Sequence, residues 1–288
     1  MFYISSLKYS IKTWVSFLRK ITEAKKPVRK AAQVLDSDAV YSKVDEIIGL
    51  SVRSKVTVIT PTTGNKYLKQ AIESVQNQDF EDLRHLVVID GQAFLEQTDE
   101  VLRNNTNHKI DVLVLPYNTG KNGMNGHRIY AALPFLVNSE YVFFLDQDNW
   151  YESNHISAMI HKMEEDDLDW VYAMRNIYTE NGAFVTQDNC ESIGDYPCFS
   201  ELPPLIDTNC YGFRRSTLVK VAHYWYHPLR ADRYFFYHLR TASPKFKSTG
   251  LYTVNYRLTE GRPPTPDYFL RGNQFMLDKY NYKLPWVR

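Results

Sequence analysis

The chain has 288 residues, of which 44% are hydrophobic and 23% are charged. These values are typical of a globular protein with one large domain or two small ones. The formal net charge of +1 gives no electrostatic reason to expect nucleic acid as a partner. The three cysteines fit no zinc spacing and predict reduced thiols in the cytoplasm. No stretch reaches the roughly 18 apolar residues that span a bilayer.

The first 30 residues are strongly basic, with eight Lys and Arg side chains against one Glu, a net charge of +7. Apolar residues recur there at steps of three and four between Ile4 and Ile21, which predicts an amphipathic helix. Two interpretations stay open for this helix. It either contacts the inner face of a membrane as a peripheral anchor, or packs against the protein's own body or a second copy. We predict that residues 1–51 form this helical arm.

A strand rich in Val and Ile ends at Thr60 and is followed by a turn and by a helix over residues 67–78. A second strand then ends at Asp90. Strand, helix and strand at this spacing predict a parallel sheet, and such sheets bind ligands at the carboxyl ends of their strands. The nucleotide-binding candidates at these ends are Thr60, Pro61, Thr62 and Asp90.

Asp90 has two interpretations. Its carboxylate would accept a hydrogen bond from a ribose hydroxyl or a base N–H, but Asp-Gly also forms turns that bind no ligand. No Gly-rich phosphate loop of either common type follows the first strand. This absence argues against a nicotinamide-dependent enzyme and against an ATPase.

A third strand over residues 111–116 leads into an irregular loop over residues 118–128, which contains three glycines and three asparagines. The loop closes into a helix. Its basic side chains Lys121, His127 and Arg128 are candidates for neutralising a diphosphate. The alternative is a solvated polar loop.

An unbroken apolar run over residues 141–145 ends in Asp146, Gln147 and Asp148. Its length and its aromatic and β-branched side chains predict a buried strand. Because buried charges need partners, we expect both acids in a crevice at the carboxyl edge of the sheet. Carboxylate oxygens are ligands for Mg²⁺ and Mn²⁺. The alternative is a helix capped by Asp148 or Asn149.

Five segments carry a resemblance to a known family: Val-Thr-Val-Ile-Thr-Pro, Ala-Ile-Glu-Ser-Val-Gln-Asn-Gln, Val-Val-Ile-Asp-Gly, Asn-Thr-Gly, and Phe-Phe-Leu-Asp-Gln-Asp-Asn-Trp. Together they resemble family 2 glycosyltransferases of the GT-A fold, specifically over Lys55 to Trp150 and more loosely to Arg257. The resemblance implies an α/β protein with a mostly parallel, Rossmann-like sheet flanked by helices. It also implies a GT-A domain over residues 52–288, with a nucleotide-sugar half over 52–150 and an acceptor half over 151–288.

The resemblance assigns roles to the strand-end residues. Thr60, Pro61 and Asp90 match the positions that hold the nucleotide, usually uridine. Asp146 and Asp148 match the Asp-x-Asp element that holds a divalent metal on the donor diphosphate. Asp148 is the expected direct ligand, and Asp146 the expected contact to the ribose or nucleotide.

The chain departs from the family pattern in two places. Ile89 stands where many members have the first of two consecutive acids. Residues 124–128 stand where many members have Ala-Arg-Asn, and Arg128 is the candidate for the missing guanidinium.

For the second half we expect a helix over residues 153–165, a strand over 170–175, an irregular stretch over 180–205 and a late edge strand over 251–257. Residues 229–240 resemble the family's Glu-Asp element, in which the Asp is the general base. This assigns Asp232 as the base, with Asp207 as the fallback, and the alternative for Asp232 is a helix cap. The Pro-rich residues 261–267 form either a lid over the donor or a surface tail.

The resemblance implies metal-dependent, inverting transfer of a sugar from a nucleoside diphosphate, UDP above all, to a hydroxyl acceptor such as a glycan in polysaccharide biosynthesis. A carboxylate base is needed because it takes the acceptor proton, an effect worth about 10²–10⁴ in rate. One alternative is a nucleotidyltransferase, although the turn after the first strand lacks the Lys and Arg that such enzymes use. The other is a catalytically silent subunit that binds a nucleotide-sugar or a glycan.

Overall fold

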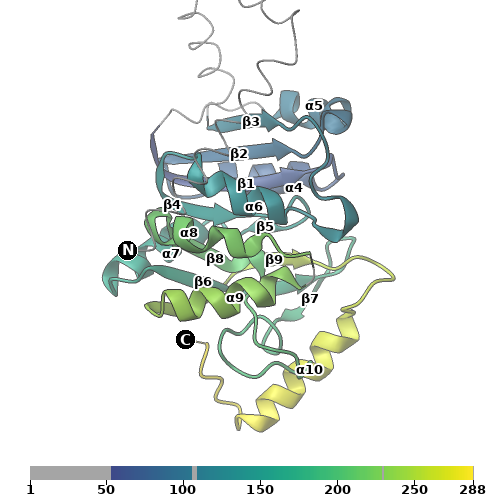
Figure 1. Ribbon diagram of the computed structural model, residues 1–288. Helices are drawn as coiled ribbons and strands as arrows, with labels where there is room; N and C mark the ends of the chain where they lie inside the picture. Colours follow the sequence, from purple (N-terminus) through teal and green to yellow (C-terminus); the bar gives the residue numbers. More distant parts are fainter. Residues whose placement is uncertain (1–52, 106–108, 229, 288) are drawn as a thin grey trace, which may run out of the picture. The chain divides into compact units, whose positions relative to one another are not determined.

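The computed structural model describes residues 53–105, 109–228 and 230–287 (Figure 1). The predicted N-terminal arm, residues 1–51, lies outside these ranges, so its helix and its partner stay predictions. Within the described residues, no helix is both long enough and apolar enough to cross a membrane.

The strands are β1 (Ser54–Thr62), β2 (Leu83–Ile89), β3 (Ile110–Val114), β4 (Ser139–Phe144), β5 (Trp150–Tyr151), β6 (Trp170–Tyr178), β7 (Phe184–Gln187), β8 (Tyr211–Arg214) and β9 (Phe246–Arg257). In the described residues they form a nine-stranded sheet with the order β3-β2-β1-β4-β8-β6-β9-β5, and β7 pairs with β6.

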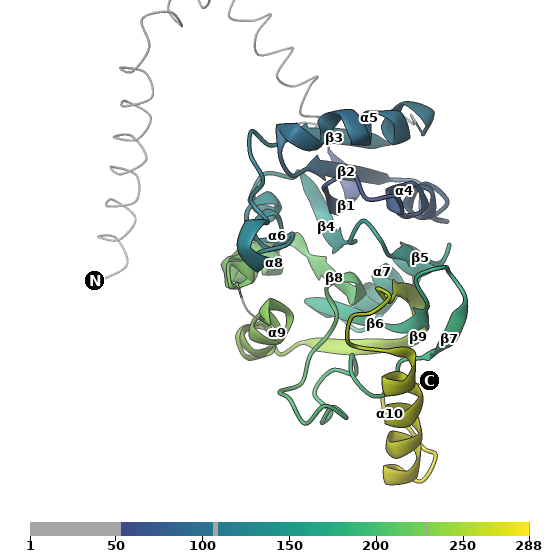
Figure 2. The same cartoon turned by 90° about the vertical axis from the view of Figure 1, so that its right-hand side faces the viewer.

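The α-helices are α4 (Leu68–Gln76), α5 (Leu95–Asn104), α6 (His127–Ala132), α7 (His155–Glu165), α8 (Arg215–Val221), α9 (Ala231–Ala242) and α10 (Pro266–Lys279). Short 3₁₀ helices are η1 (Gln92–Phe94), η2 (Lys121–Gly123), η3 (Leu133–Phe135), η4 (Thr208–Cys210) and η5 (Ala222–Trp225). Two views show α6, α8 and α9 on one face of the sheet and α4 and α7 on the other (Figures 1 and 2).

The first half of the sheet is parallel, because β1 lies between β2 and β4 and β3 continues the same direction. The register places Thr62 beside Ile89 and Ile59 beside Phe144. Most side chains of β1 and β4 are buried on both faces, as in parallel strands that helices cover on two sides. The predicted Rossmann-like half is confirmed, and its strand ends share one edge.

The second half of the sheet is mixed. β8 runs antiparallel to both β4 and β6, whereas β6 and β9 run parallel. The predicted strand over residues 251–257 is confirmed as the last part of β9, but its edge position is wrong, because β9 starts at Phe246 and lies between β6 and β5. The Phe246 ring stacks on Trp170 of β6 at 4.1 Å, and this contact between distant parts of the sequence extends the strand. The stretch expected to be irregular contains β7.

The Pro-rich stretch leads into helix α10, and the choice between a lid and a surface tail for residues 261–267 stays a prediction. Thr265 accepts a hydrogen bond from a backbone N–H of the first turn, and Pro266 occupies the first helical position. Asn273 then ties the helix to β7, because its amide donates to the Thr186 hydroxyl at 2.9 Å. Trp286 beyond the helix is also buried. The C-terminal segment is therefore packed against the second half of the chain, beside β7.

Candidate active site

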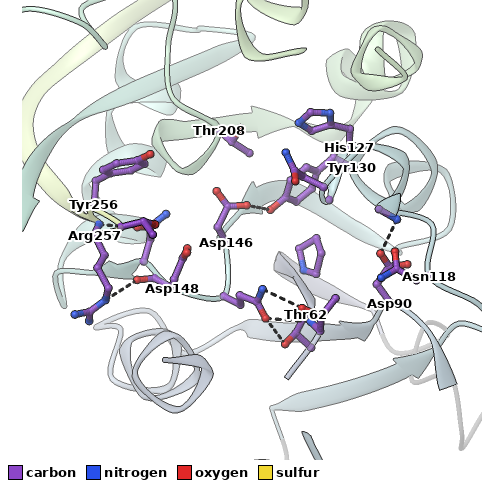
Figure 3. Close-up of a pocket in the computed structure, with 18 residues that line it drawn as sticks. Thr62, Asp90, Asn118, His127, Tyr130, Asp146, Asp148, Thr208, Tyr256 and Arg257 are labelled. Atoms are coloured by element: carbon purple, nitrogen blue, oxygen red, sulfur yellow. Dashed lines mark hydrogen bonds between the residues drawn. The ribbon is translucent and has the colours of Figure 1, made fainter. Parts of the chain in front are cut away.

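A pocket of about 370 Å³ opens where β1, β2 and β4 end (Figure 3). Figure 3 shows Asp90 and Asn118 at one end of it and Asp148 and Arg257 at the other, with Asp146 between them. The sequence-predicted residues that line the pocket are Pro61, Thr62, Asp90, His127, Asp146, Gln147 and Asp148. The structure therefore brings most of the predicted residues to one place.

Asp90 orders the loop that follows β3. One carboxylate oxygen accepts the backbone N–H and the hydroxyl of Thr119, both at 2.7 Å, and the other accepts the Gly120 N–H at 2.8 Å. A Cβ at Gly120 would stand 2.9 Å from Asp90 Oδ2 and would collide with the Asn125 carbonyl oxygen. Asn118 beside them has a buried side-chain oxygen without a hydrogen-bond partner in the described residues. This end of the pocket is polar, and the Asn118 oxygen is free to accept from a ligand.

Gln147 fastens the turn that follows β1. Its side-chain oxygen accepts from the Thr62 hydroxyl at 2.7 Å, from Thr63 N at 3.0 Å and from Asn65 N at 3.2 Å. This carbonyl oxygen is therefore saturated by the protein. Gln147 shapes the pocket wall by holding the turn.

Asp146 is held from two sides. Its carboxylate accepts from the Tyr130 hydroxyl at 2.7 Å and from the Asn209 amide at 2.9 Å, and its backbone N–H donates to the Asn209 oxygen at 2.6 Å. Burial, together with the charges of Asp148 and Asp207, raises the pKa of Asp146 to about 7. A cation in the pocket would relieve this concentration of negative charge.

Asp148 lines the pocket, and no other described side chain forms a hydrogen bond or an ion pair with its carboxylate. Burial raises its pKa, while the charge of Arg257 lowers it. Arg257 itself donates to the Asp148 backbone carbonyl at 3.1 Å, and its guanidinium lies 4.0 Å from the Tyr67 ring centre and 4.8 Å from that of Trp150. The Asp148 carboxylate is thus free to bind a ligand on a loop that Arg257 fixes.

The residues fit a divalent cation that a substrate also helps to coordinate. Among the described side chains, no three His, Cys, Asp or Glu converge as a metal cage. Mg²⁺ is usually held by one or two carboxylates together with substrate phosphates and water. Asp148 offers a free carboxylate for such a site, whereas both oxygens of Asp146 are already engaged.

Three of the predicted donor contacts do not line the pocket. Thr60 is fully buried and bonds to His85 Nε2 at 2.8 Å, because it lies two residues inside the end of β1. Lys121 is exposed on η2. Arg128 donates to the Thr119 carbonyl at 3.1 Å and lies 5.3 Å from the Tyr226 ring centre. Thr60 is therefore a core residue rather than a donor contact. Lys121 and Arg128 occupy a surface position and a loop contact, and their predicted contacts with the donor stay predictions.

Asp232 lies in the first turn of α9 and does not line the pocket. The predicted alternative of a helix cap is wrong, because Arg230 occupies the cap position. One Asp232 oxygen accepts the following N–H, of Arg233, at 2.8 Å. Burial raises the pKa of Asp232, and the nearby Asp207 charge adds to the effect.

Asp207, the fallback base, is more heavily engaged. Its carboxylate binds the buried Arg175 at 2.6 Å and accepts from the Asn209 amide at 2.7 Å. Arg175 also bonds the fully buried Asp188 at 2.7 Å. Of the two candidate bases, Asp232 has the fewer internal partners.

Sequence reasoning missed Tyr130, Asn209 and Arg257. Arg257 ends β9, so the rule that ligands bind at strand ends could have singled it out. No sequence signal ties Tyr130 or Asn209 to Asp146, because their contact depends on how α6 and η4 pack on the sheet.

Comparisons with known proteins agree with this arrangement. The family model described as glycosyl transferase family 2 matches residues 57–222. A glucosyltransferase of Campylobacter jejuni, named GalNAc(5)-diNAcBac-PP-undecaprenol beta-1,3-glucosyltransferase, is 32% identical over 112 residues, which cover 38% of this chain and 35% of the relative. Glycosyltransferase GlyA of Streptococcus pneumoniae is 27% identical over 140 residues, which cover 45% of this chain and 18% of that protein.

Solved structures show the same fold. A crystal structure of S. aureus TarS 1-349 superposes with a TM-score of 0.52 at 18% identity, covering 78% of this chain and 65% of that one. The crystal structure of the same TarS fragment in complex with UDP-GlcNAc superposes with a TM-score of 0.52 at 19% identity, covering 78% of this chain and 66% of that one. The chain spans only part of the curated relatives, about a third of one and a fifth of the other. The match over more than half of the chain and the GT-A fold together show that this protein belongs to glycosyl transferase family 2.

Proposed function

We propose that this protein transfers a sugar from a UDP-sugar donor to a hydroxyl group of a glycan. The transfer inverts the anomeric carbon and uses a divalent cation. One observation carries the proposal. A single pocket has a polar end at Asp90 and Asn118 and a carboxylate end at Asp146 and Asp148. A nucleoside diphosphate needs these two environments, one for its base and ribose and one for its metal-bound phosphates.

Each end of the pocket suits a different part of the nucleotide-sugar donor. The Asp90 end suits the base and ribose, which offer N–H and O–H donors and acceptors. The diphosphate then lies toward Asp148, with Arg257 behind it. TarS, which shares the fold, has been solved with UDP and with UDP-GlcNAc, and this supports UDP as the donor nucleotide.

Asp148 would bind the cation directly, and Asp146, fixed by Tyr130 and Asn209, would add negative charge behind it. When bound, Mg²⁺ or Mn²⁺ neutralises the negative charge that develops on the departing diphosphate. The protein's own part is to hold the carboxylate and the turn in place before the donor arrives.

Asp232 is the proposed general base. As the acceptor oxygen forms its bond to the anomeric carbon, its proton passes to the Asp232 carboxylate. The bond from that carbon to the diphosphate oxygen breaks, and its electron pair leaves with the nucleoside diphosphate. A single displacement of this kind inverts the anomeric centre. The glycan acceptor is supported by the name of the Campylobacter relative, which acts on a lipid-linked saccharide.

Thermal unfolding with nucleotides tests the proposal on the parent, on Asp148→Asn and on the control Asp278→Asn in α10. UDP with Mn²⁺ at 100 times its dissociation constant should add about 2.7 kcal/mol, which raises Tm by roughly 2–4 °C per kcal/mol. The rise should occur in the parent and in Asp278→Asn. An equal, metal-dependent rise in Asp148→Asn would contradict the assigned ligand.

A further inference from the structure

A second pocket adjoins the first one at the end that carries Asp148. Its volume is about 380 Å³, and Asp148, Arg257 and Thr259 line both pockets. Lys66 and Glu180 line only the second of the two. Asp148 and Arg257 lie at the end of the first pocket that is opposite Asp90 (Figure 3). The Lys66 side chain therefore lies beyond the metal-side end of the proposed donor site.

The first pocket carries little positive charge for a site that holds a diphosphate. Three carboxyl groups line it, those of Asp90, Asp146 and Asp148, together with one guanidinium, that of Arg257. His127 also lines this pocket, but burial lowers the pKa of His127, so its ring is neutral at neutral pH. One divalent cation does not balance these acids and a diphosphate together. Sites that transfer groups from diphosphates commonly add Lys or Arg to the metal ion.

The backbone of Lys66 is fixed beside the loop that carries Asp148. Asn65, the preceding residue, donates its backbone N–H to the side-chain oxygen of Gln147 at 3.2 Å, and Gln147 directly precedes Asp148. The Asn65 side chain in turn accepts the backbone N–H of Tyr67 at 2.9 Å. The chain is thus ordered on both sides of Lys66, while its flexible four-carbon stem lets the ammonium move over this end of the site.

The Lys66 ammonium is held only weakly by its acidic partner. Its Nζ lies 3.3 Å from Glu180 Oε1 and 4.8 Å from the Tyr67 ring centre, and the Lys66 side chain is 71% exposed. An ion pair this exposed adds little stability. Glu180 also accepts from the Tyr67 hydroxyl at 3.2 Å and from the Glu260 N–H at 2.8 Å. The Glu180 carboxylate therefore keeps two hydrogen bonds when Lys66 turns toward a ligand.

We infer that Lys66 binds the β-phosphate of the donor nucleotide and stabilises it as part of the leaving group. This inference rests on the proposed function and adds a residue to it. With the base and ribose at the Asp90 end, the β-phosphate is the phosphate farther from Asp90 and nearer to Lys66. When the bond to the anomeric carbon breaks, its electron pair goes to an oxygen of this phosphate. Lys66 stays protonated and donates a hydrogen bond to the phosphate, which lowers the cost of the added charge.

Titration with UDP and with UMP, each with Mn²⁺, tests the inference on the full chain. The variants are Lys66→Met and Lys66→Arg. The control is Lys69→Met in α4, where Lys69 is 63% exposed and pairs with Glu73 at 3.7 Å. Lys66→Met should bind UDP about tenfold more weakly, as expected for the loss of one hydrogen bond to a charged group. It should bind UMP as the parent does, because UMP has no β-phosphate. Lys66→Arg should recover most of the UDP affinity, and the control should match the parent with both nucleotides.

Other results would overturn the inference in distinguishable ways. If Lys66→Met binds UDP as tightly as the parent does, the inference fails alone and the proposed function stands. If Lys66→Met loses affinity for UMP and UDP by the same factor, Lys66 supports the pocket as a whole rather than the β-phosphate. An equal loss of UDP affinity in Lys69→Met would assign the effect to the charge of the chain. If the parent binds neither nucleotide, the proposed function and the inference fail together.

Discussion

At the residue scale, the carboxylates of Asp148 and Asp232 have different proposed roles and different surroundings. In the proposed mechanism, Asp148 binds a cation, whereas Asp232 takes a proton. Asp148 is free of other side chains in the described structure but shares its loop with Asp146. Asp232 is held next to Asp207, Arg175 and Arg233, whose charges act on it in opposite directions. The surroundings of each carboxylate therefore suit the role that we propose for it.

The raised pKa of Asp232 leads to a prediction for the pH dependence of transfer. A base acts only when it is unprotonated, so kcat/KM should fall as pH falls through the pKa of Asp232. Because burial raises that pKa, the fall should begin at a higher pH than for a solvent-exposed Asp. Initial rates measured from pH 4 to 8 check this.

Asp232→Asn should lower kcat by about 10²–10⁴ and should leave stabilisation by UDP unchanged. Asp232→Glu restores a carboxylate and should recover part of the rate together with an acid limb. Full activity of Asp232→Asn would remove Asp232 from the mechanism and return attention to Asp207.

Gly120 carries a second prediction at this scale. Its backbone angle, φ −80°, suits any residue, so a substitution there adds a steric contact without straining the backbone. Gly120→Ala would push its Cβ against the Asn125 carbonyl and Asp90, and should displace the loop that Asp90 orders. We expect weaker stabilisation by UDP together with a lower Tm. A UDP response equal to that of the parent would show that the loop does not contribute to nucleotide binding.

At the element scale, the buried Arg175 joins β6 to the turn after β7 and to η4. It bonds Asp188 at 2.7 Å and Asp207 at 2.6 Å, and it lies 4.4 Å from the ring centre of Tyr256 in β9. Arg175→Met would leave the buried Asp188 and the partly buried Asp207 without their cation. Breaking such a pair costs roughly 3–5 kcal/mol.

Urea unfolding measures this loss, with Lys245→Met as the matched control. Lys245 pairs with Asp167 at 3.2 Å, but both side chains are largely exposed, so its loss should cost about 0–1 kcal/mol. If Arg175→Met and Lys245→Met unfolded at similar urea concentrations, the protein would have relaxed around the missing Arg175 guanidinium.

The same elements show how far sequence patterns reach. β1, α4 and β2 follow one another closely, and their apolar pattern is local, so the parallel half could be predicted. The start of β9 depends on Trp170, which is distant in sequence, so only its last part was predicted. Helix α10 was missed although Thr265, Pro266 and Asp267 form a recognisable helix start.

The site divides in the same way. The acids that end β2 and β4 could be placed at one edge because parallel strands end together. Thr60 was misplaced, since the pattern does not say which residue is the last one covered by its neighbours. Asn209 and Tyr130 reach Asp146 from elements whose packing the sequence does not reveal.

At the scale of the whole molecule, the parallel and mixed halves of the sheet meet at the pocket. β4 leads into the loop that carries Asp146 and Asp148 and pairs with β8, and β8 leads through α8 to α9, which carries Asp232. The proposed metal ligand and the proposed base therefore follow two neighbouring strands of one sheet, β4 and β8.

The contacts of Arg257 have a consequence for how such proteins diversify. Its guanidinium binds Gln70 in α4, the Asp148 carbonyl and the Glu180 carbonyl, so three distant segments depend on one side chain. A chimera that exchanged everything after residue 150 with a relative would separate Arg257 from Gln70 and Asp148. Such a chimera would keep the Asp148 loop in place only if the exchanged part brought a side chain that restores these contacts.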